Sequence, residues 1–145
     1  MMKRTWIIVL LSLTAFACAA QSEQRAAAPE KIQTEDRTAA GIVDAQLAAY
    51  NQHDLDALLH FFHPDIESFK FPGERQLQGL KSLREAFANQ FNHQPREVVV
   101  ERIVEKNHVI DKVEVTIVVE GQTMTHHGTV IYTIEDNLIR TMMFL

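Results

Sequence analysis

The sequence predicts an α+β domain in which three N-terminal helices pack on a curved antiparallel sheet. Two observations lead to this fold class. Apolar side chains repeat mainly at helical spacing as far as residue 91, whereas residues 98–145 carry β-branched and alternating apolar side chains broken by short turns. Helices followed by a run of strands are typical of α+β domains, in which the helices cover one face of the sheet. The chain has 145 residues and a hydrophobic fraction of 46%, which suits one domain with a real core.

The first two helices are expected close together. Residues 36–51 form the first, and their apolar side chains share one face: Ile42, Val43, Leu47 and Tyr50. Asp54 is a suitable N-cap for the second, since its carboxylate can accept the free amide protons of the first turn. Helical spacing then continues through Leu55, Leu58, Leu59 and Phe62. Pro64 disfavours helix for the residue before it, so the second helix is expected to end near residue 62 or 63.

The remaining elements follow from turn residues and periodicity. A strand is expected over residues 66–71, closed by a turn at Pro72-Gly73. A third helix follows Gly79 and ends near Pro95, and its apolar face consists of Leu80, Leu83, Phe87 and Phe91. Four antiparallel strands then fill residues 98–105, 108–120, 123–135 and 138–145, with turns at 106–107, 121–122 and 136–137.

The N-terminus has the composition of a secretory signal peptide over residues 1–20. Lys3 and Arg4 form a positive segment, residues 6–16 are apolar but too short to span a bilayer, and small residues follow. Two processing routes remain open. Ordinary cleavage is preferred, and lipidation of Cys18 in a segment similar to a bacterial lipobox is the alternative. The domain at 36–145, behind a flexible tether at 21–35, is therefore expected to be periplasmic or secreted, or anchored to a membrane through Cys18.

Charge and cysteine content exclude several classes of function. The net charge of −5 argues against a general nucleic-acid partner, since phosphate binding needs a basic face. Cys18 is the only cysteine and lies in the leader, so the mature domain has no disulfide, no cysteine nucleophile and no cysteine metal site. The sequence also lacks a glycine-rich phosphate loop, and no cofactor is expected.

Several short motifs occur in an order that resembles the nuclear transport factor 2-like superfamily. They are Asp54-Leu55-Asp56, Pro72-Gly73, Leu83-Arg84 and Val109-Ile110-Asp111. The sequence looks most similar to the SnoaL-like and ketosteroid-isomerase-like bacterial members. This resemblance implies a cone-shaped fold whose open end binds a small apolar molecule, in a homodimer packed through the sheet. It implies either isomerase, cyclase or hydratase activity, or a non-enzymatic dimerisation or interaction module.

The catalytic residues of ketosteroid isomerases do not carry over to this chain. Those enzymes use a carboxylate base near the lip of the cone, with a tyrosine and a protonated aspartic acid as the oxyanion hole. The matching positions here hold Lys70, Gln46 and Val130. Steroid isomerisation by that mechanism is therefore not expected.

The resemblance and the strand periodicity together give a set of candidate site residues. The expected ligand-binding residues are Phe69, Phe71, Phe87, Val113, Val115, Ile117, Val130 and Tyr132. His126 shares the phase of the inward strand residues, and a histidine there could act as a general base or acid near neutral pH. Tyr50 could supply a hydroxyl donor and Asp65 a carboxylate, so these three are the candidate catalytic residues.

Each candidate also has a structural interpretation. The histidine and the tyrosine could be hydrogen-bonded core residues, and the aspartate could serve in a turn or cap. Asp111 is expected to form an ion pair with Arg84 or Arg102. His60 and His63 could contribute to a zinc site, but their spacing is not that of a metal motif, so no metal is expected.

Overall fold

The computed structural model describes residues 38–145, and the predicted leader with Cys18, the whole predicted tether and the first two residues of the expected first helix lie outside that range. Export, cleavage and lipidation therefore stay predictions. The described elements, in chain order, are α1 (Ala39–Asn51), α2 (Leu55–Leu59), β1 (Phe62–Lys70), β2 (Glu74–Gln78), α3 (Gly79–Phe91), β3 (Arg96–Glu105), β4 (His108–Val119), β5 (Gln122–Glu135) and β6 (Leu138–Phe144). None of these helices is long and apolar enough to cross a membrane.

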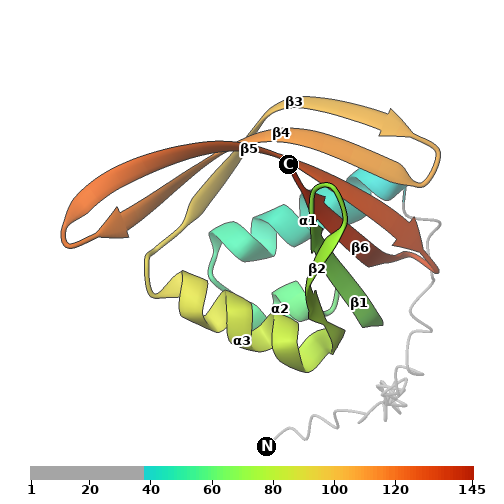
Figure 1. Ribbon diagram of the computed structural model, residues 1–145, viewed down its shortest axis with the longest axis horizontal. Coiled ribbons are helices and arrows are strands. Elements are labelled where there is room, and N and C mark those ends of the chain that lie inside the picture. The colour runs from blue at the N-terminus through green and yellow to red at the C-terminus, as the bar shows by residue number, and fades with distance from the viewer. Residues whose placement is uncertain (1–37) are drawn as a thin grey trace, which may run out of the picture. The chain divides into compact units, whose positions relative to one another are not determined.

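The strands form one curved, open sheet of six strands in the order β2-β1-β6-β5-β4-β3. All three described helices lie beneath its arch, on one face (Figure 1). This arrangement confirms the predicted α+β class. The sheet departs from the predicted antiparallel pairing at one place, because β1 and β6 run parallel. Alternation in a sequence shows which residues share a face, but it does not give the direction of a distant partner strand.

Strand β1 begins earlier than predicted. Helix α2 ends at Leu59, and Phe62 already pairs with Ile139 of β6. Pro64 lies inside the strand, where the β1–β6 register is interrupted between Phe62 and Glu67. A residue without an N–H is tolerated at such an irregularity because the ladder lacks a hydrogen bond there in any case. A further short strand, β2, follows the Pro72-Gly73 turn and pairs with β1.

The predicted third helix is confirmed, and so are the hairpin turns, although one of them shifts by a residue. Leu83 is buried, and the rest of the predicted apolar face of α3 packs against the core. The β4–β5 turn lies at Glu120-Gly121 rather than at 121–122. Both residues have positive φ angles, 51° and 78°, which suit a tight two-residue hairpin turn.

A buried ion pair joins β3 to β4 and reaches α1. The guanidinium of Arg102 donates to the two carboxylate oxygens of Asp111 at 2.6 and 2.7 Å, and to Asp44 at 2.5 Å. The Asp111 side chain is only 1% exposed, so its charge depends on this partner. Of the two predicted partners, Arg102 is therefore the correct one. Arg84 instead pairs with Asp56, between α3 and α2, at 2.6 Å.

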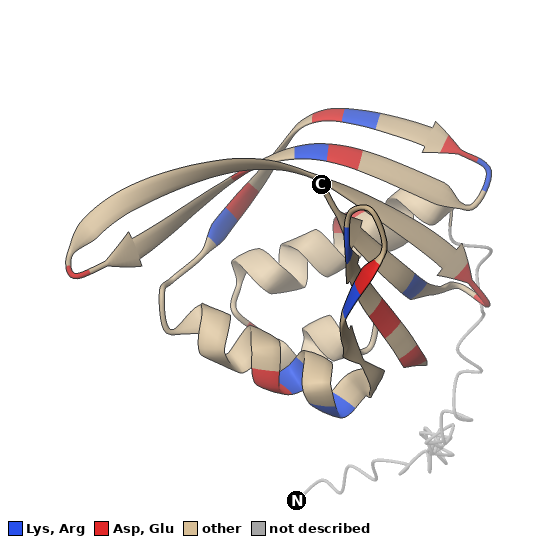
Figure 2. Cartoon of the chain, viewed as in Figure 1, with Lys and Arg blue, Asp and Glu red and all other residues tan. Residues whose placement is uncertain are grey.

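Acidic and basic residues lie side by side on β3 and β4 (Figure 2). Glu101 and Lys112 stand opposite each other in the register and form an ion pair of 2.5 Å. Both side chains are more than half exposed, so the pair contributes little to stability.

Candidate functional site

A cavity of about 360 Å³ lies on the helix-covered face of β4 and β5. The end of α3, the start of β3 and the C-terminus complete its wall, in the region where the connection from α3 rises toward the β4–β5 hairpin (Figure 1). Its apolar lining consists of Val113, Val115, Ile117, Val130, Phe144 and Leu145. Its polar lining consists of Gln90, His93, Glu97, His126, His127 and Thr129. The cavity is therefore an apolar chamber with a few convergent polar groups, as small-molecule sites usually are.

Two of these polar groups face the cavity in one row across the sheet. Glu97 of β3 is paired with Val115 of β4, and Val115 is paired with His126 of β5. Directly opposite residues of antiparallel strands share a face, and neighbouring strands lie about 4.8 Å apart, so the Cα atoms of Glu97 and His126 stand roughly 10 Å apart. Val115, which also lines the cavity, lies between them in this row.

The backbone around Glu97 is fixed by side chains at the end of α1 and just after it. The Asn51 amide donates to the Glu97 carbonyl at 2.9 Å and accepts from the Glu97 N–H at 2.8 Å. His53 adds a contact of 2.7 Å between its Nε2 and the carbonyl of the buried Pro95. These bonds hold the first residues of β3 against the end of α1, so the position of the carboxylate is set by the core rather than by a loose loop.

The Glu97 carboxyl has an unusual acidity. Burial, and secondly the negative charge of Asp111, raise the pKa of Glu97 to about 7. Within residues 38–145 the carboxylate has no hydrogen-bond or ion-pair partner that would favour its charged form. A carboxyl group with a pKa near 7 can both donate and accept a proton at neutral pH.

Sequence reasoning did not identify Glu97. The run Val98-Val99-Val100 hides the phase of the strand, because all three residues are apolar whichever face they occupy. A register shift between Val99 and Glu101 then breaks the alternation further along β3. One signal was available in the sequence. Glu97 stands two residues before Val99 at the start of a strand, and side chains two residues apart in a strand share a face.

Tyr50 lies behind the cavity wall. Its side chain is 3% exposed, and its ring packs edge-on against Phe87 and Phe91 at centroid distances of 5.8 and 5.6 Å. Its hydroxyl and the Oε1 of Gln46, one helical turn earlier, are buried without a hydrogen-bond partner in the described part of the chain. Burial, and then the nearby charge of Glu97, raise the pKa of the Tyr50 hydroxyl above its ordinary value, so the group stays protonated at neutral pH.

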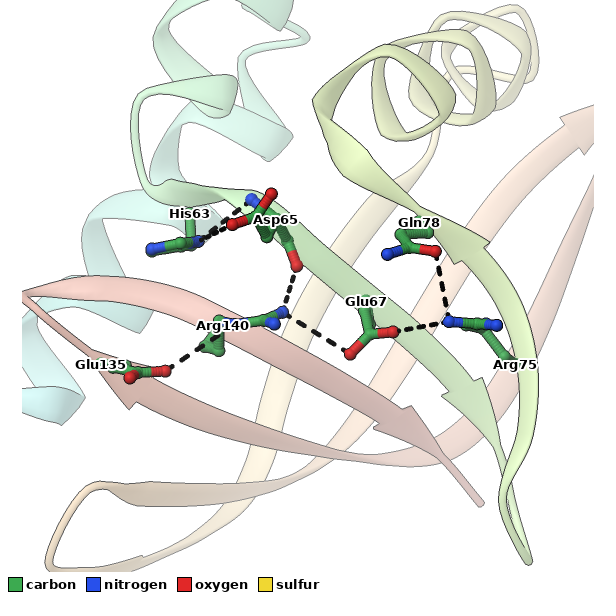
Figure 3. Close-up of polar contacts among 7 residues, drawn as sticks. All are labelled: His63, Asp65, Glu67, Arg75, Gln78, Glu135 and Arg140. Carbon is green, nitrogen blue, oxygen red and sulfur yellow. Dashed lines mark hydrogen bonds and ion pairs between the residues drawn. The ribbon is translucent and has the colours of Figure 1, made fainter.

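The three predicted catalytic residues are not brought together. His126 lines the cavity, Tyr50 is behind it, and Asp65 lies on β1 with a side chain that is 74% exposed. In Figure 3 the carbonyl of Asp65 accepts from Arg140 of β6 and its N–H donates to His63 Nδ1 at 3.0 Å. The expected place of Asp65 at the cone is corrected because β1 begins before Pro64, which puts Asp65 inside a strand.

Half of the predicted ligand-binding residues line the cavity, namely Val113, Val115, Ile117 and Val130. The other four lie elsewhere. Phe69 follows the buried Ser68 on the opposite face of β1, and Phe71 is 61% exposed in the turn beyond β1. Phe87 and Tyr132 belong to the core or pack against it. Strand phase was therefore a good guide in the regular β4–β5 hairpin and a poor one near the irregular β1.

His60 and His63, which lie outside the cavity, have local partners. His60 Nδ1 lies 2.7 Å from the carbonyl of Asp56, and His63 contacts Asp65 as described above. His127, at the cavity edge, lies 3.9 Å from Glu114, its partner across the β4–β5 ladder. Over residues 38–145, no three His, Cys, Asp or Glu side chains are grouped in an arrangement that could hold a metal ion.

Solved structures with the same architecture share little sequence with this chain. A cystatin-fold protein from Novosphingobium aromaticivorans is 18% identical with a TM-score of 0.67, over 74% of this chain and 97% of that one. A nuclear transport factor 2-like protein from Cytophaga hutchinsonii is 16% identical with a TM-score of 0.61, over 74% and 88%. The epoxide hydrolase/cyclase-like enzyme of pyran ring formation in salinomycin is 13% identical with a TM-score of 0.68, over 74% and 88%. At these identities the likeness shows a shared fold.

Comparison with curated proteins gave no match. The model of the SnoaL-like domain family matches residues 43–142, from the middle of α1 into β6. This span contains every element that forms the cavity wall except the last residues of the chain. The chain therefore belongs to the SnoaL-like domain family, within the nuclear transport factor 2-like superfamily.

Proposed function

We propose that this domain binds a small, largely apolar molecule in the cavity beneath β4 and β5, and that Glu97 exchanges a proton with it. The observation that carries the proposal is an open chamber of about 360 Å³ with a carboxyl group of pKa about 7 in its wall. A dimerisation module that does not use its cone would be expected to fill it with side chains. An open cavity with convergent polar groups favours a small-molecule function instead.

General acid/base catalysis is the chemistry that these groups support best. Glu97 takes the role of proton donor or acceptor, because a catalytic pKa near the operating pH keeps both forms available. His126 stands on the far side of the same row and would act on the opposite end of the ligand. Isomerisation, cyclisation and hydration of an apolar substrate can each use such a pair. The described activity of the salinomycin enzyme belongs to this group of reactions.

Native mass spectrometry of the mature protein from its own host tests the binding part of this proposal. We expect a small apolar compound retained by the folded protein, and a thermal shift with compounds of the same class. A protein without adduct and without thermal shift against a panel of apolar ligands would refute the small-molecule function. The same run measures the mass of the N-terminus, which separates a lipidated Cys18 from ordinary cleavage.

Turnover of the retained compound tests the catalytic part. The variant Glu97→Gln removes the titrating proton and keeps the size of the side chain, so we expect kcat to fall by roughly 10²–10⁴ with little change in KM. Glu101→Gln, on the same strand but paired with Lys112, is the matched control. An unchanged kcat in the Glu97 variant would exclude Glu97 as the acid/base.

A second candidate function is protein interaction through the outer face of the sheet. The exposed apolar residues of β3 are Val98, Val100 and Ile103, with exposed fractions of 50%, 67% and 53%. Apolar residues grouped on one edge strand are more typical of an interaction surface than single exposed apolar residues are. A shallower cavity of about 450 Å³ adjoins Val100 and Leu145. A homodimer would cover this face, and light scattering of wild type against Val100→Lys measures it. A monomeric wild-type protein would refute the homodimer.

A further inference from the structure

Within residues 38–145, the lining of the cavity includes an acidic side chain but no lysine or arginine. Of the residues from the described range that line it, Glu97 is the single acidic one, and none is Lys or Arg. The carboxylate of Glu97 is partly buried and has no hydrogen-bond or ion-pair partner there, whereas the neighbouring Asp111 is bound by Arg102 through two hydrogen bonds. A partly buried carboxyl group that no side chain compensates either takes up a proton, as the pKa of about 7 indicates, or is held in its charged form by a ligand that supplies the missing positive charge and donors.

We infer that the ligand of this cavity is a small apolar amine whose protonated nitrogen pairs with the Glu97 carboxylate. This inference rests on the proposed function, because it names the ligand class of the same site. The hydrocarbon part of the amine contacts Val113, Val115 and Ile117, which separate Glu97 from the far end of the cavity. The ammonium group supplies the charge-assisted hydrogen bonds that the carboxylate lacks.

Other ligand classes fit this wall less well. A carboxylate or phosphate ligand would place a second negative charge beside Glu97, and no lysine or arginine of the lining would compensate for it. A neutral alcohol could donate one hydrogen bond to Glu97, but it would leave the negative charge unbalanced. An amine of similar shape makes the hydrogen bond and neutralises the charge, so it should bind more tightly than the alcohol.

Amine binding should depend on pH through Glu97. A bound ammonium favours the charged form of Glu97, so it lowers the pKa of that carboxyl group from its value of about 7. The other titratable or charged groups that face Glu97 or line the same cavity are His93 after α3, Asp111 of β4, Arg102 of β3, Tyr50 of α1, and His126, His127 and Tyr132 of β5. A comparison with the Glu97→Gln variant removes their contributions, because they are present in both proteins.

Three rigid probes of one shape test the inference: 1-adamantylamine, 1-adamantanol and 1-adamantanecarboxylate. Affinities are measured at pH 8 by NMR titration for wild type, Glu97→Gln and the control Glu101→Gln. We expect the amine to bind wild type at least tenfold more tightly than the alcohol, and the carboxylate to bind most weakly. In Glu97→Gln the amine should lose at least tenfold in affinity while the alcohol changes by less than about twofold.

The carboxyl carbon signal of Glu97 gives a second readout. With saturating amine, its titration midpoint should fall by at least one pH unit, and with saturating alcohol it should not fall. Equal affinity of wild type for amine and alcohol, or an amine preference that persists in Glu97→Gln, would overturn the inference and leave the small-molecule function standing. If none of the three probes binds to the folded wild-type protein, both the inference and the proposed function are overturned.

Discussion

Replacement of Glu97 by Gln should change the pH dependence of folding stability in a predictable direction. The pKa of Glu97 rises from 4.5 to about 7 on folding, chiefly through burial. At ~1.4 kcal/mol per pH unit, this makes the charged form in the folded state unfavourable by about 3 kcal/mol, an upper value because the side chain is only partly buried. Glutamine cannot ionise, so the variant carries no such penalty.

The direction of this pH dependence follows from whether the folded or the unfolded protein binds the Glu97 proton more tightly. Below pH 4.5 Glu97 is protonated in the folded and the unfolded protein, and it adds no pH dependence. Between pH 4.5 and 7 the folded state retains a proton that the unfolded state has lost, so stability falls as pH rises. Above pH 8 the loss is complete. The stability of Glu97→Gln relative to wild type should therefore increase by about 2–3 kcal/mol between pH 4.5 and 8.

Urea denaturation followed by far-ultraviolet circular dichroism measures this difference. The single tryptophan, Trp6, lies in the predicted leader, so the mature domain offers no tryptophan fluorescence. Glu101→Gln is the control, since its carboxylate is exposed and paired with Lys112. A difference between Glu97→Gln and wild type that stays constant within 0.5 kcal/mol from pH 4.5 to 8 would refute the conclusion that Glu97 is partly buried without a compensating partner.

Three further substitutions test the surroundings of the cavity, and a fourth tests a residue outside it. Asn51→Ala removes both hydrogen bonds to the Glu97 backbone and should destabilise the domain by about 1–3 kcal/mol in urea denaturation. Asp111→Asn leaves Arg102 without its buried partner and should cost about 3–5 kcal/mol in the same assay. Tyr50→Phe deletes an unpartnered hydroxyl, so calorimetry should show no loss or a gain of up to about 1 kcal/mol, and a clear loss would contradict its isolation. Asp65→Asn should leave ligand affinity unchanged, since its side chain is exposed on β1.

Regular segments were predictable from sequence because their local pattern agrees with their final environment. The apolar face of α3 and the inward phase of β4 and β5 both follow from spacing alone. The segment around Pro64 was not predictable in this way. Local preference favoured a longer helix, and pairing of Phe62 with Ile139, seventy-seven residues away, decided in favour of a strand.

The candidate site was less accessible to sequence reasoning than the fold. His126 could be found because the inward and outward residues of its strand alternate without interruption. Glu97 stands before three consecutive valines, which do not show which residues of that strand point inward. Nothing local indicates that Glu97 is bonded to the end of α1 and lies beside β4. That information lies in the contacts of Asn51 and Asp111, which come from other elements. A residue that a distant contact makes functional has no local signature.

Glu97 and Asp111 differ in their partners, and the absence of a partner, rather than depth of burial, singles out Glu97 as the proposed functional group. Asp111 is the more deeply buried, but Arg102 donates two short hydrogen bonds to it, so its charge is already compensated within the core. Glu97 is less buried and faces a cavity, but it has no cation beside it and it feels the charge of Asp111. The ion pair therefore compensates the charge of Asp111 within the fold, whereas no lysine or arginine of residues 38–145 lines the cavity beside Glu97. A ligand is left to balance that charge, which is the physical basis for proposing both proton transfer and amine recognition at Glu97.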